Sequence, residues 1–151
     1  MTNNNKSISY SWTTEKYIQY VENATNTMLK EFQKIELEYL LNINSPTSKT
    51  FIDIGAGYGR VIPQIANIAR NVIAIELNDG LFEELKRRCN NLNNAKAIKG
   101  NADFLSELLK DQDLQKPVIL CLQNSLGTWE GDYKKALKEM GLPAGRQDIL
   151  G

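Results

Sequence analysis

The stretch TFIDIGAGYGR, residues 50–60, decides the fold. Its first five residues are aromatic or β-branched apart from Asp53, and the run stops at a glycine. A short apolar run that ends at a turn signal predicts a strand buried on both faces of a parallel sheet. Gly55, Gly57 and Gly59 then follow at alternate positions, where glycine permits positive φ angles and lets a ligand approach the backbone.

Three more apolar runs follow, and a helical pattern separates each run from the next. This alternation requires parallel strands joined by crossover helices, so we predict an α/β fold with a doubly wound, mainly parallel, Rossmann-like sheet. The predicted strands span residues 50–54, 71–77, 95–100 and 117–123, and the predicted helices span residues 60–70, 80–91, 103–110 and 132–140.

The region before the first strand has a different character. Residues 1–12 are polar and rich in Asn and Ser, which predicts a flexible N-terminal tail. Residues 13–41 predict helices with a break at NATN, residues 23–26. One helix face carries an apolar stripe that we expect to be core rather than a lid, formed by Met28, Phe32, Ile35 and Tyr39.

Composition excludes several classes of function. The 151 residues include 18 basic and 18 acidic side chains, so no broad basic surface for nucleic acid or for a membrane is expected. The basic run at residues 86–88 follows Glu83 and Glu84, which predicts local ion pairs on a solvated helix face. The chain has no histidine and two distant cysteines, so we expect no metal site and no Ser-His-Asp or Cys-His catalysis. Cys89 and Cys121 are expected to be buried free thiols of a cytoplasmic protein, and no apolar run approaches the ~20 residues of a membrane span.

The glycine turn follows the first strand, and parallel sheets bind ligands beyond the carboxyl ends of their strands. The dinucleotide fingerprint G-x-G-x-x-G fails here, because its third glycine would fall at Arg60. The carboxylate of Asp53 would repel a phosphate, whereas it can help to hold an ammonium group. The turn therefore favours a zwitterionic ligand without phosphate and disfavours NAD.

The spacing Asp53-x-Gly55-x-Gly57-x-Gly59 resembles the first motif of the class I S-adenosylmethionine-dependent methyltransferases. The resemblance implies that S-adenosyl-L-methionine is the cofactor. Glu76 ends the second strand 19 residues after Gly57, close to the ~20 expected for an acid that binds ribose hydroxyls. The cofactor-binding residues implied in these two segments are Asp53, Gly55, Ala56, Gly57, Tyr58, Gly59, Glu76 and Leu77.

Two weaker segments fall at the ends of the third and fourth strands. In GNADF the resemblance implies that Asp103 faces the adenine amino group beside Ala102, while a plain helix N-cap is the alternative. In CLQNSLGTW it places Asn124 beside the methionine end and the acceptor, while an ordinary loop residue is the alternative. Tyr58 either packs over the ligand or points to solvent, and no catalytic base stands out.

The end of the chain departs from the family pattern. Members usually continue with three more strands. Here Gly141, Pro143 and Gly145 fall within five residues, so residues 141–151 predict an atypical tail. We therefore expect residues 13–140 to be an incomplete methyltransferase domain whose fourth strand lies at an edge. A truncated or altered C-terminus is the main interpretation, and a true short form that dimerises through that strand is the alternative.

These patterns lead to one main hypothesis and one alternative. The main hypothesis is an enzyme that transfers a methyl group from S-adenosyl-L-methionine to a small-molecule amine or hydroxyl acceptor. The alternative is a non-catalytic remnant of such an enzyme that binds a metabolite or nucleotide. Arg60 and Asp53 disfavour an NAD-dependent oxidoreductase, and the zero net charge disfavours a nucleic acid methyltransferase.

Overall fold

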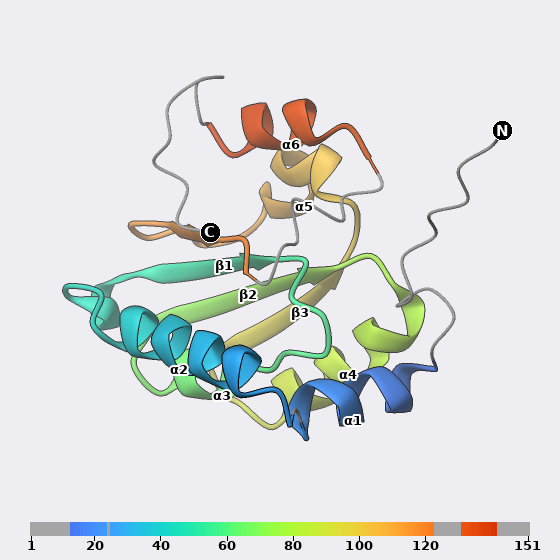
Figure 1. The fold of residues 1–151 in the computed structure, drawn as a ribbon. Helices are drawn as coiled ribbons and strands as arrows, with labels where there is room; N and C mark the ends of the chain where they lie inside the picture. The colour runs from blue at the N-terminus through green and yellow to red at the C-terminus, as the bar shows by residue number, and fades with distance from the viewer. Residues whose placement is uncertain (1–12, 24, 123–130, 142–151) are drawn as a thin grey trace, which may run out of the picture. The chain divides into compact units, whose positions relative to one another are not determined.

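The computed structural model describes residues 13–23, 25–122 and 131–141 (Figure 1). The chain divides into two compact units, residues 1–39 and residues 40–151. Two helices make up the described part of the first unit, α1 (Thr14–Glu22) and most of α2 (Thr27–Leu41). The predicted break between two helices is therefore confirmed.

Short polar side chains set the starts of both helices, as N-caps do. The Thr13 hydroxyl accepts a hydrogen bond from the Lys16 amide at 3.3 Å, and the Asn26 side chain accepts one from the Met28 amide at 2.9 Å. The four side chains of the predicted apolar stripe on α2 are exposed, so they form no core within this unit. A unit of this size has too little apolar surface to enclose them.

The second unit is built on a parallel sheet with the strand order β3-β2-β1-β4. Among the described residues, β4 thus lies at an edge of this sheet, as expected for the fourth strand. All five residues of β1 are buried, because β1 lies between two strands and is covered on both faces. The strands are β1 (Thr50–Ile54), β2 (Asn71–Glu76), β3 (Ala95–Lys99) and β4 (Val118–Leu120), so β4 is four residues shorter than predicted.

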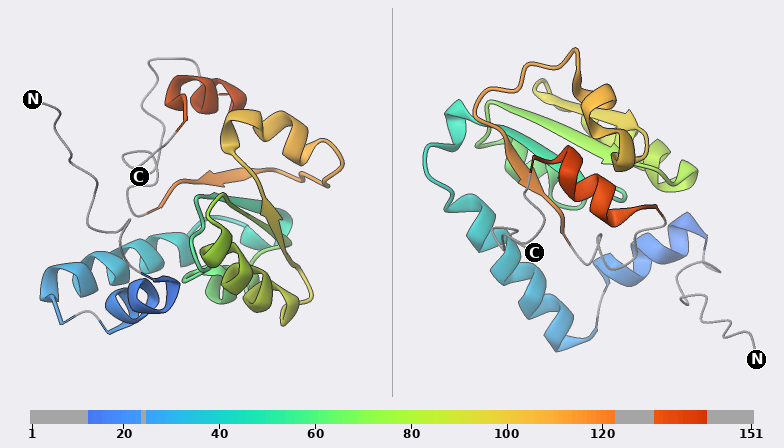
Figure 2. Two further views of the ribbon diagram at one scale, coloured as in Figure 1. Left: turned by 90° about the vertical axis from the view of Figure 1, so that its right-hand side faces the viewer. Right: turned by 90° about the horizontal axis from the view of Figure 1, so that it is seen from above.

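Helices cover both faces of the sheet, as two views at right angles show (Figures 1 and 2). On one face lie α3 (Ile62–Ala66) and α4 (Asp79–Asn90); on the other lie η3 (Ala102–Phe104), α5 (Leu105–Leu109) and α6 (Tyr133–Glu139). Successive strand residues point to opposite faces, so the two cores share the strands. Phe51, Val72 and Ala74 pack with α3 and α4, whereas Ile52, Ile54, Ile73 and Ile75 pack with η3, α5 and α6.

The helix after the glycine turn is shorter than predicted, since α3 starts at Ile62 and ends at Ala66. Its start is delayed because the turn continues through the third glycine, and Pro63 lies in its first turn, where a missing N–H is tolerated. Its end is set from outside: the Asn94 amide nitrogen donates to the carbonyls of Ala66 and Ala69 at 2.9 and 3.1 Å. Sequence periodicity cannot reveal a cap that comes from 25 to 28 residues away.

Candidate functional site

The glycine turn at the carboxyl end of β1 has a backbone that favours glycine. Gly55, Gly57 and Gly59 have φ angles of 69°, 59° and 82°, in the left-handed region. The amides of Gly55 and Ala56 both donate to the carbonyl of Ile75, at 2.9 and 3.0 Å, which ties the turn to β2. A side chain on Gly57 would meet nothing within 4 Å among the described residues, so the backbone there is open to close approach.

The carboxylate of Glu76 holds this turn from the end of β2. Its Oε2 atom accepts a hydrogen bond from the Gly57 amide at 2.8 Å. Its Oε1 atom accepts from the amides of Leu77 and Asn78 at 2.9 and 2.8 Å. A carboxylate has about four acceptor positions, so these bonds leave about one for a ligand. Glu76 is only 9% exposed, so the structure brings it together with the glycine turn in a nearly buried place.

Asp53 lies inside the sheet beneath the turn. It is 2% exposed and is paired in register with Ala74 of β2 and Leu120 of β4. Burial, together with the negative charge of Asp53, raises the pKa of the Cys121 thiol to about 12. Asp53 and Cys121 therefore lie near each other at the ends of the two adjacent strands, and this thiol stays protonated at neutral pH.

Asp103 connects the end of β3 to the start of α6. The N-cap of η3 is Asn101, whose side chain accepts from the Asp103 amide at 2.9 Å, so the cap role belongs to Asn101 and not to Asp103. The Asp103 carboxylate is 8% exposed, and its Oδ2 atom accepts from the Asp132 amide at 3.0 Å. A Cβ atom on Gly131 would lie 2.4 Å from the same oxygen, so this approach requires glycine.

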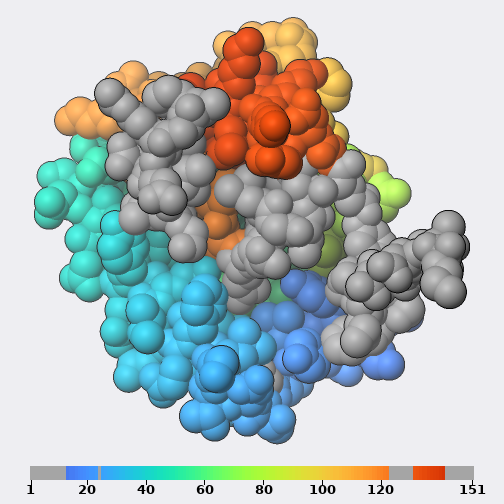
Figure 3. All heavy atoms as spheres, turned by 45° about the horizontal axis from the view of Figure 1, so that its top comes forward, coloured from blue at the N-terminus to red at the C-terminus, as the bar shows by residue number. Residues whose placement is uncertain are grey.

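Several contacts fix α6 beside η3 and α5, and the space-filling view shows α6 (red) against α5 (yellow-orange) (Figure 3). The Asp132 side chain caps α6 by accepting from the amides of Lys134 and Lys135 at 3.0 and 3.2 Å. The Lys135 ammonium lies 3.9 Å from the centre of the Phe104 ring. The Glu139 carboxylate accepts from the Ser106 amide at 2.8 Å. Asp132 has no motif around it, and sequence reasoning therefore missed its contact with Asp103.

The remaining predicted residues have different surroundings. Tyr58 is 3% exposed, and the Arg88 guanidinium lies 4.8 Å from the centre of its ring. Of the two alternatives for Tyr58, the one in which it points to solvent is therefore wrong. Leu77 is 48% exposed beside Glu76, and Ala102 is buried next to Asp103. Asn124 lies outside the described residues.

Both thiols are free and buried, as predicted. Burial raises the pKa of Cys89 to about 11. Within residues 13–23, 25–122 and 131–141, no group of His, Cys, Asp and Glu side chains is arranged to hold a metal ion. Among the helices in those same ranges, none is both long and apolar enough to cross a membrane.

Comparison with known families now adds to this geometry. A family model described as "Putative methyltransferase" matches residues 47–121, which contain the glycine turn, Glu76 and Asp103. Over these residues the chain is therefore similar to a methyltransferase family. No curated protein matches the chain by sequence.

Solved methyltransferase structures share this fold. One is a putative S-adenosyl-L-methionine-dependent methyltransferase from Methanococcus maripaludis, with a TM-score of 0.63, 21% identity, and coverage of 93% of this chain and 61% of that one. Another is a TehB-like S-adenosylmethionine-dependent methyltransferase from Corynebacterium glutamicum, with a TM-score of 0.59, 20% identity, and coverage of 84% and 64%. This chain thus spans less than two thirds of either methyltransferase.

Proposed function

We propose that this chain is a methyltransferase that binds S-adenosyl-L-methionine across the carboxyl ends of β1 and β2. The observation that carries the proposal is the 2.8 Å hydrogen bond between the Gly57 amide and the Glu76 carboxylate. It joins the two sequence features that resemble the cofactor site of the family. The neighbours described as S-adenosylmethionine-dependent methyltransferases support the same cofactor.

The residues present fit this cofactor. Glu76 has about one acceptor position left for a ribose hydroxyl, and the bare backbone at Gly57 lets the nucleoside approach. Leu77 offers exposed apolar surface beside Glu76, suited to the flat face of adenine. Asp53 places a buried negative charge beneath the turn, where it attracts the ammonium group of the methionine end.

The bound cofactor supplies a methyl group on a sulfonium sulfur, so the protein's task is to align the acceptor with it and to exclude water. The turn and Glu76 hold the nucleoside, and the contact between Asp103 and Asp132 fixes α6 at the same edge of the sheet. We assign Asn124 to the acceptor side on the strength of the family resemblance. The chain has no histidine, so a base of that kind takes no part in the transfer.

We propose a small-molecule amine or hydroxyl compound as the acceptor. The zero net charge of the chain supports a small molecule over nucleic acid, because nucleic acid binding needs clustered basic side chains. A neighbour from Staphylococcus aureus, a putative caffeoyl-CoA O-methyltransferase, has a TM-score of 0.52 at 20% identity and covers 83% of this chain and 65% of that one. Two free thiols fit a reducing compartment such as the cytoplasm.

Isothermal titration calorimetry with S-adenosyl-L-methionine and S-adenosylhomocysteine tests the cofactor. We expect saturable heat for both ligands, with competition between them, and no heat with NAD. A folded sample that gives no heat of binding at millimolar ligand would contradict the proposal. A radiolabelled methyl group then tests turnover across a panel of amines and alcohols. Binding without transfer to any of them would favour a binding remnant over an enzyme.

Self-association through β4 is a second proposal. In the part of the chain that the structure describes, β4 pairs with β1 on one side and lies at the end of the strand order. Exposed sheet edges present unpaired backbone groups that another chain can use. Sedimentation velocity at several protein concentrations is expected to show a dimer at the higher ones. The substitution Ile119→Pro is expected to abolish the dimer. A monomer at all concentrations would count against pairing through this edge.

A further inference from the structure

We propose that Arg88 of α4 is a positioning residue for the glycine turn, acting through the ring of Tyr58. This inference rests on the proposed cofactor site, because it states that Arg88 helps to maintain the conformation of the backbone that the cofactor approaches. Arg88 lies 30 positions after Tyr58 in the sequence, and nothing in the glycine motif points to it.

Tyr58 is the large side chain of the turn. It stands between Gly57 and Gly59, which have positive φ angles and no side chains with which to hold the backbone. Anchoring by a side chain at this point therefore depends on Tyr58. Its ring is 3% exposed and has the Arg88 guanidinium 4.8 Å from its centre, within the range of a cation–π contact.

Arg88 also covers the next residue of the turn. A Cβ atom built on Gly59 would lie 2.8 Å from Leu85 Cδ1 and 3.7 Å from Arg88 Cδ. Leu85 and Arg88 are three positions apart on α4, which places them on one face of the helix. The stem of Arg88 thus approaches Gly59 while its charged end lies over Tyr58. An arginine spans both positions because its long apolar stem packs while its head stays polar.

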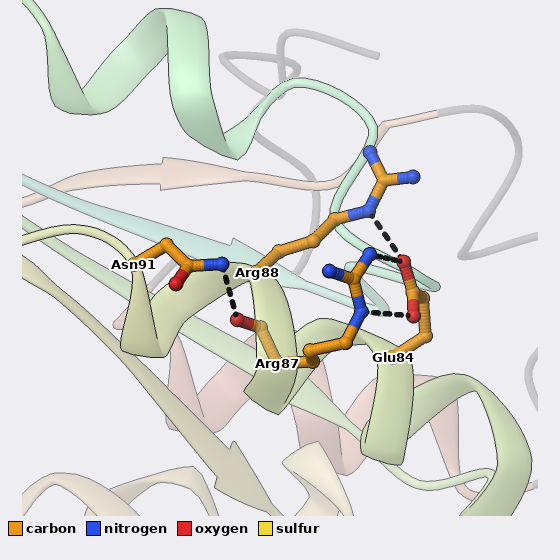
Figure 4. Close-up of polar contacts among 4 residues, drawn as sticks. All are labelled: Glu84, Arg87, Arg88 and Asn91. Carbon is orange, nitrogen blue, oxygen red and sulfur yellow. Dashed lines mark hydrogen bonds and ion pairs between the residues drawn. The ribbon is translucent and has the colours of Figure 1, made fainter.

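A carboxylate on the same helix fixes the guanidinium. Arg88 Nε donates to Glu84 Oε1 at 3.0 Å, and the Arg88 side chain is 22% exposed. Arg87 reaches the same carboxylate with two hydrogen bonds of 2.8 and 2.6 Å, and both arginines point toward Glu84 (Figure 4). Hydrogen bonds from Arg87 and Arg88 hold the pKa of Glu84 near 2, so the carboxylate stays charged at neutral pH.

The turn is therefore held from two sides. Glu76 binds the Gly57 amide from β2, and Arg88 holds Tyr58 from α4. Gly57 is the point of open backbone between these two contacts. If the contact from α4 is removed, the turn loses one of the contacts that hold Gly57 in place. The predicted consequence is a looser turn and weaker cofactor binding.

Arg87 provides a matched control. It shares the Glu84 carboxylate and the same turn of α4, but its side chain is 64% exposed. Arg87→Met and Arg88→Met each remove one cation; the first removes two hydrogen bonds to Glu84 and the second removes one. They differ in the contact with Tyr58, so a difference between the variants reports that contact. Arg88→Lys keeps a cation and most of the stem and tests for partial rescue.

The experiment measures binding of S-adenosyl-L-methionine and hydrogen exchange of the Gly57 and Gly59 amides in the ligand-free protein. We expect Arg88→Met to weaken binding about 5- to 10-fold and to speed both exchange rates, with Arg88→Lys in between. Arg87→Met is expected to stay within about twofold of wild type. Equal losses in both methionine variants, or wild-type values in Arg88→Met, would overturn the inference.

The two readouts separate this inference from the proposed function. If the wild-type chain binds no S-adenosyl-L-methionine, the cofactor proposal fails, whereas the exchange rates still decide whether Arg88 holds the turn. If Arg88→Met does not fold, Tyr58→Leu and Arg88→Lys carry the same comparison against Arg87→Met. Faster exchange in both, with Arg87→Met unchanged, supports the inference, and unchanged exchange in both overturns it.

Discussion

The carboxylate of Glu76 accepts a hydrogen bond from the backbone amide of Gly57 at 2.8 Å, across 19 residues of sequence. The strand that ends at Glu76 lies next to the strand that precedes the turn, and their parallel register brings the two residues together. The same carboxylate also accepts from the amides of Leu77 and Asn78. Glu76 therefore shapes the turn before any ligand binds, besides its proposed role toward the ribose.

Glu76→Ala is predicted to weaken binding of S-adenosyl-L-methionine by about 1–3 kcal/mol, because the charged acceptor is lost and three amides lose their partner. It should also lower the free energy of unfolding, which a ligand contact alone would not do. Calorimetry and urea denaturation measure the two effects. Glu83→Ala, at an exposed position on α4, is the control and should change neither. Unchanged affinity in Glu76→Ala would remove Glu76 from the site.

Gly59 and Gly57 are predicted to respond differently to alanine. Both have positive φ angles, so each substitution introduces backbone strain of about 1–2 kcal/mol. At Gly59 the new Cβ would also lie 2.8 Å from Leu85 Cδ1, and Leu85 is fully buried. Overpacking there adds about 1–3 kcal/mol. Urea denaturation should therefore rank Gly59→Ala as the less stable variant, and the reverse order would contradict the close packing of α4 on the turn.

The approach of Asp103 to Gly131 is predicted to be sterically tight. Gly131→Ala should destabilise the protein by about 1–3 kcal/mol, since its Cβ would lie 2.4 Å from the Asp103 carboxylate. Asp103→Ala should destabilise by a similar amount, because the Asp132 amide loses its acceptor. In the double variant Gly131→Ala plus Asp103→Ala, the new Cβ atom no longer meets a carboxylate. The loss of stability in the double variant should therefore be smaller than the sum of the losses in the two single variants. Strict additivity in thermal unfolding would show that the contact has no energetic weight.

Much of the fold follows from local sequence patterns. The order of strands and helices, the parallel sheet and the glycine turn at the end of β1 were all predicted, because each depends on a run of apolar residues and the turn signal that ends it. The contact between Glu76 and Gly57 is also predictable from the sequence, because the lengths of the strands and of the crossover set the register of a βαβ unit.

The contacts that were missed join segments whose spacing carries no signal. Asp132 meets Asp103 across 29 residues, and its identity suggests only a helix cap, a role that it also fills. Arg88 belongs to a run predicted to form ion pairs on a solvated face. The pairs with Glu84 are present, but the side chain is mostly buried over Tyr58. Ends of helices were missed for a similar reason, because Asn94 caps α3 from a different element.

The two cysteines are predicted to be unreactive in the folded protein. Burial raises the pKa of Cys89 to about 11 and that of Cys121 to about 12, the latter with a further contribution from the charge of Asp53. At pH 8 only about one thiol in a thousand or fewer is then ionised, and the thiolate is the reactive form. Iodoacetamide at pH 8 should label neither cysteine in the native protein and both after unfolding in urea. Rapid labelling of Cys121 in the native state would contradict its burial beside Asp53.

The same thiols make stability depend on alkaline pH. Because both pKa values are raised in the folded state, their contribution is fully present below the ordinary value of 9.0. It is then lost as the pH rises from 9 through about 11 and 12, since the unfolded chain releases these protons first. Urea midpoints measured between pH 8 and pH 10.5 should therefore fall. The decline should be shallower in Cys121→Ala than in the wild-type chain, and an identical slope would show that this thiol does not contribute.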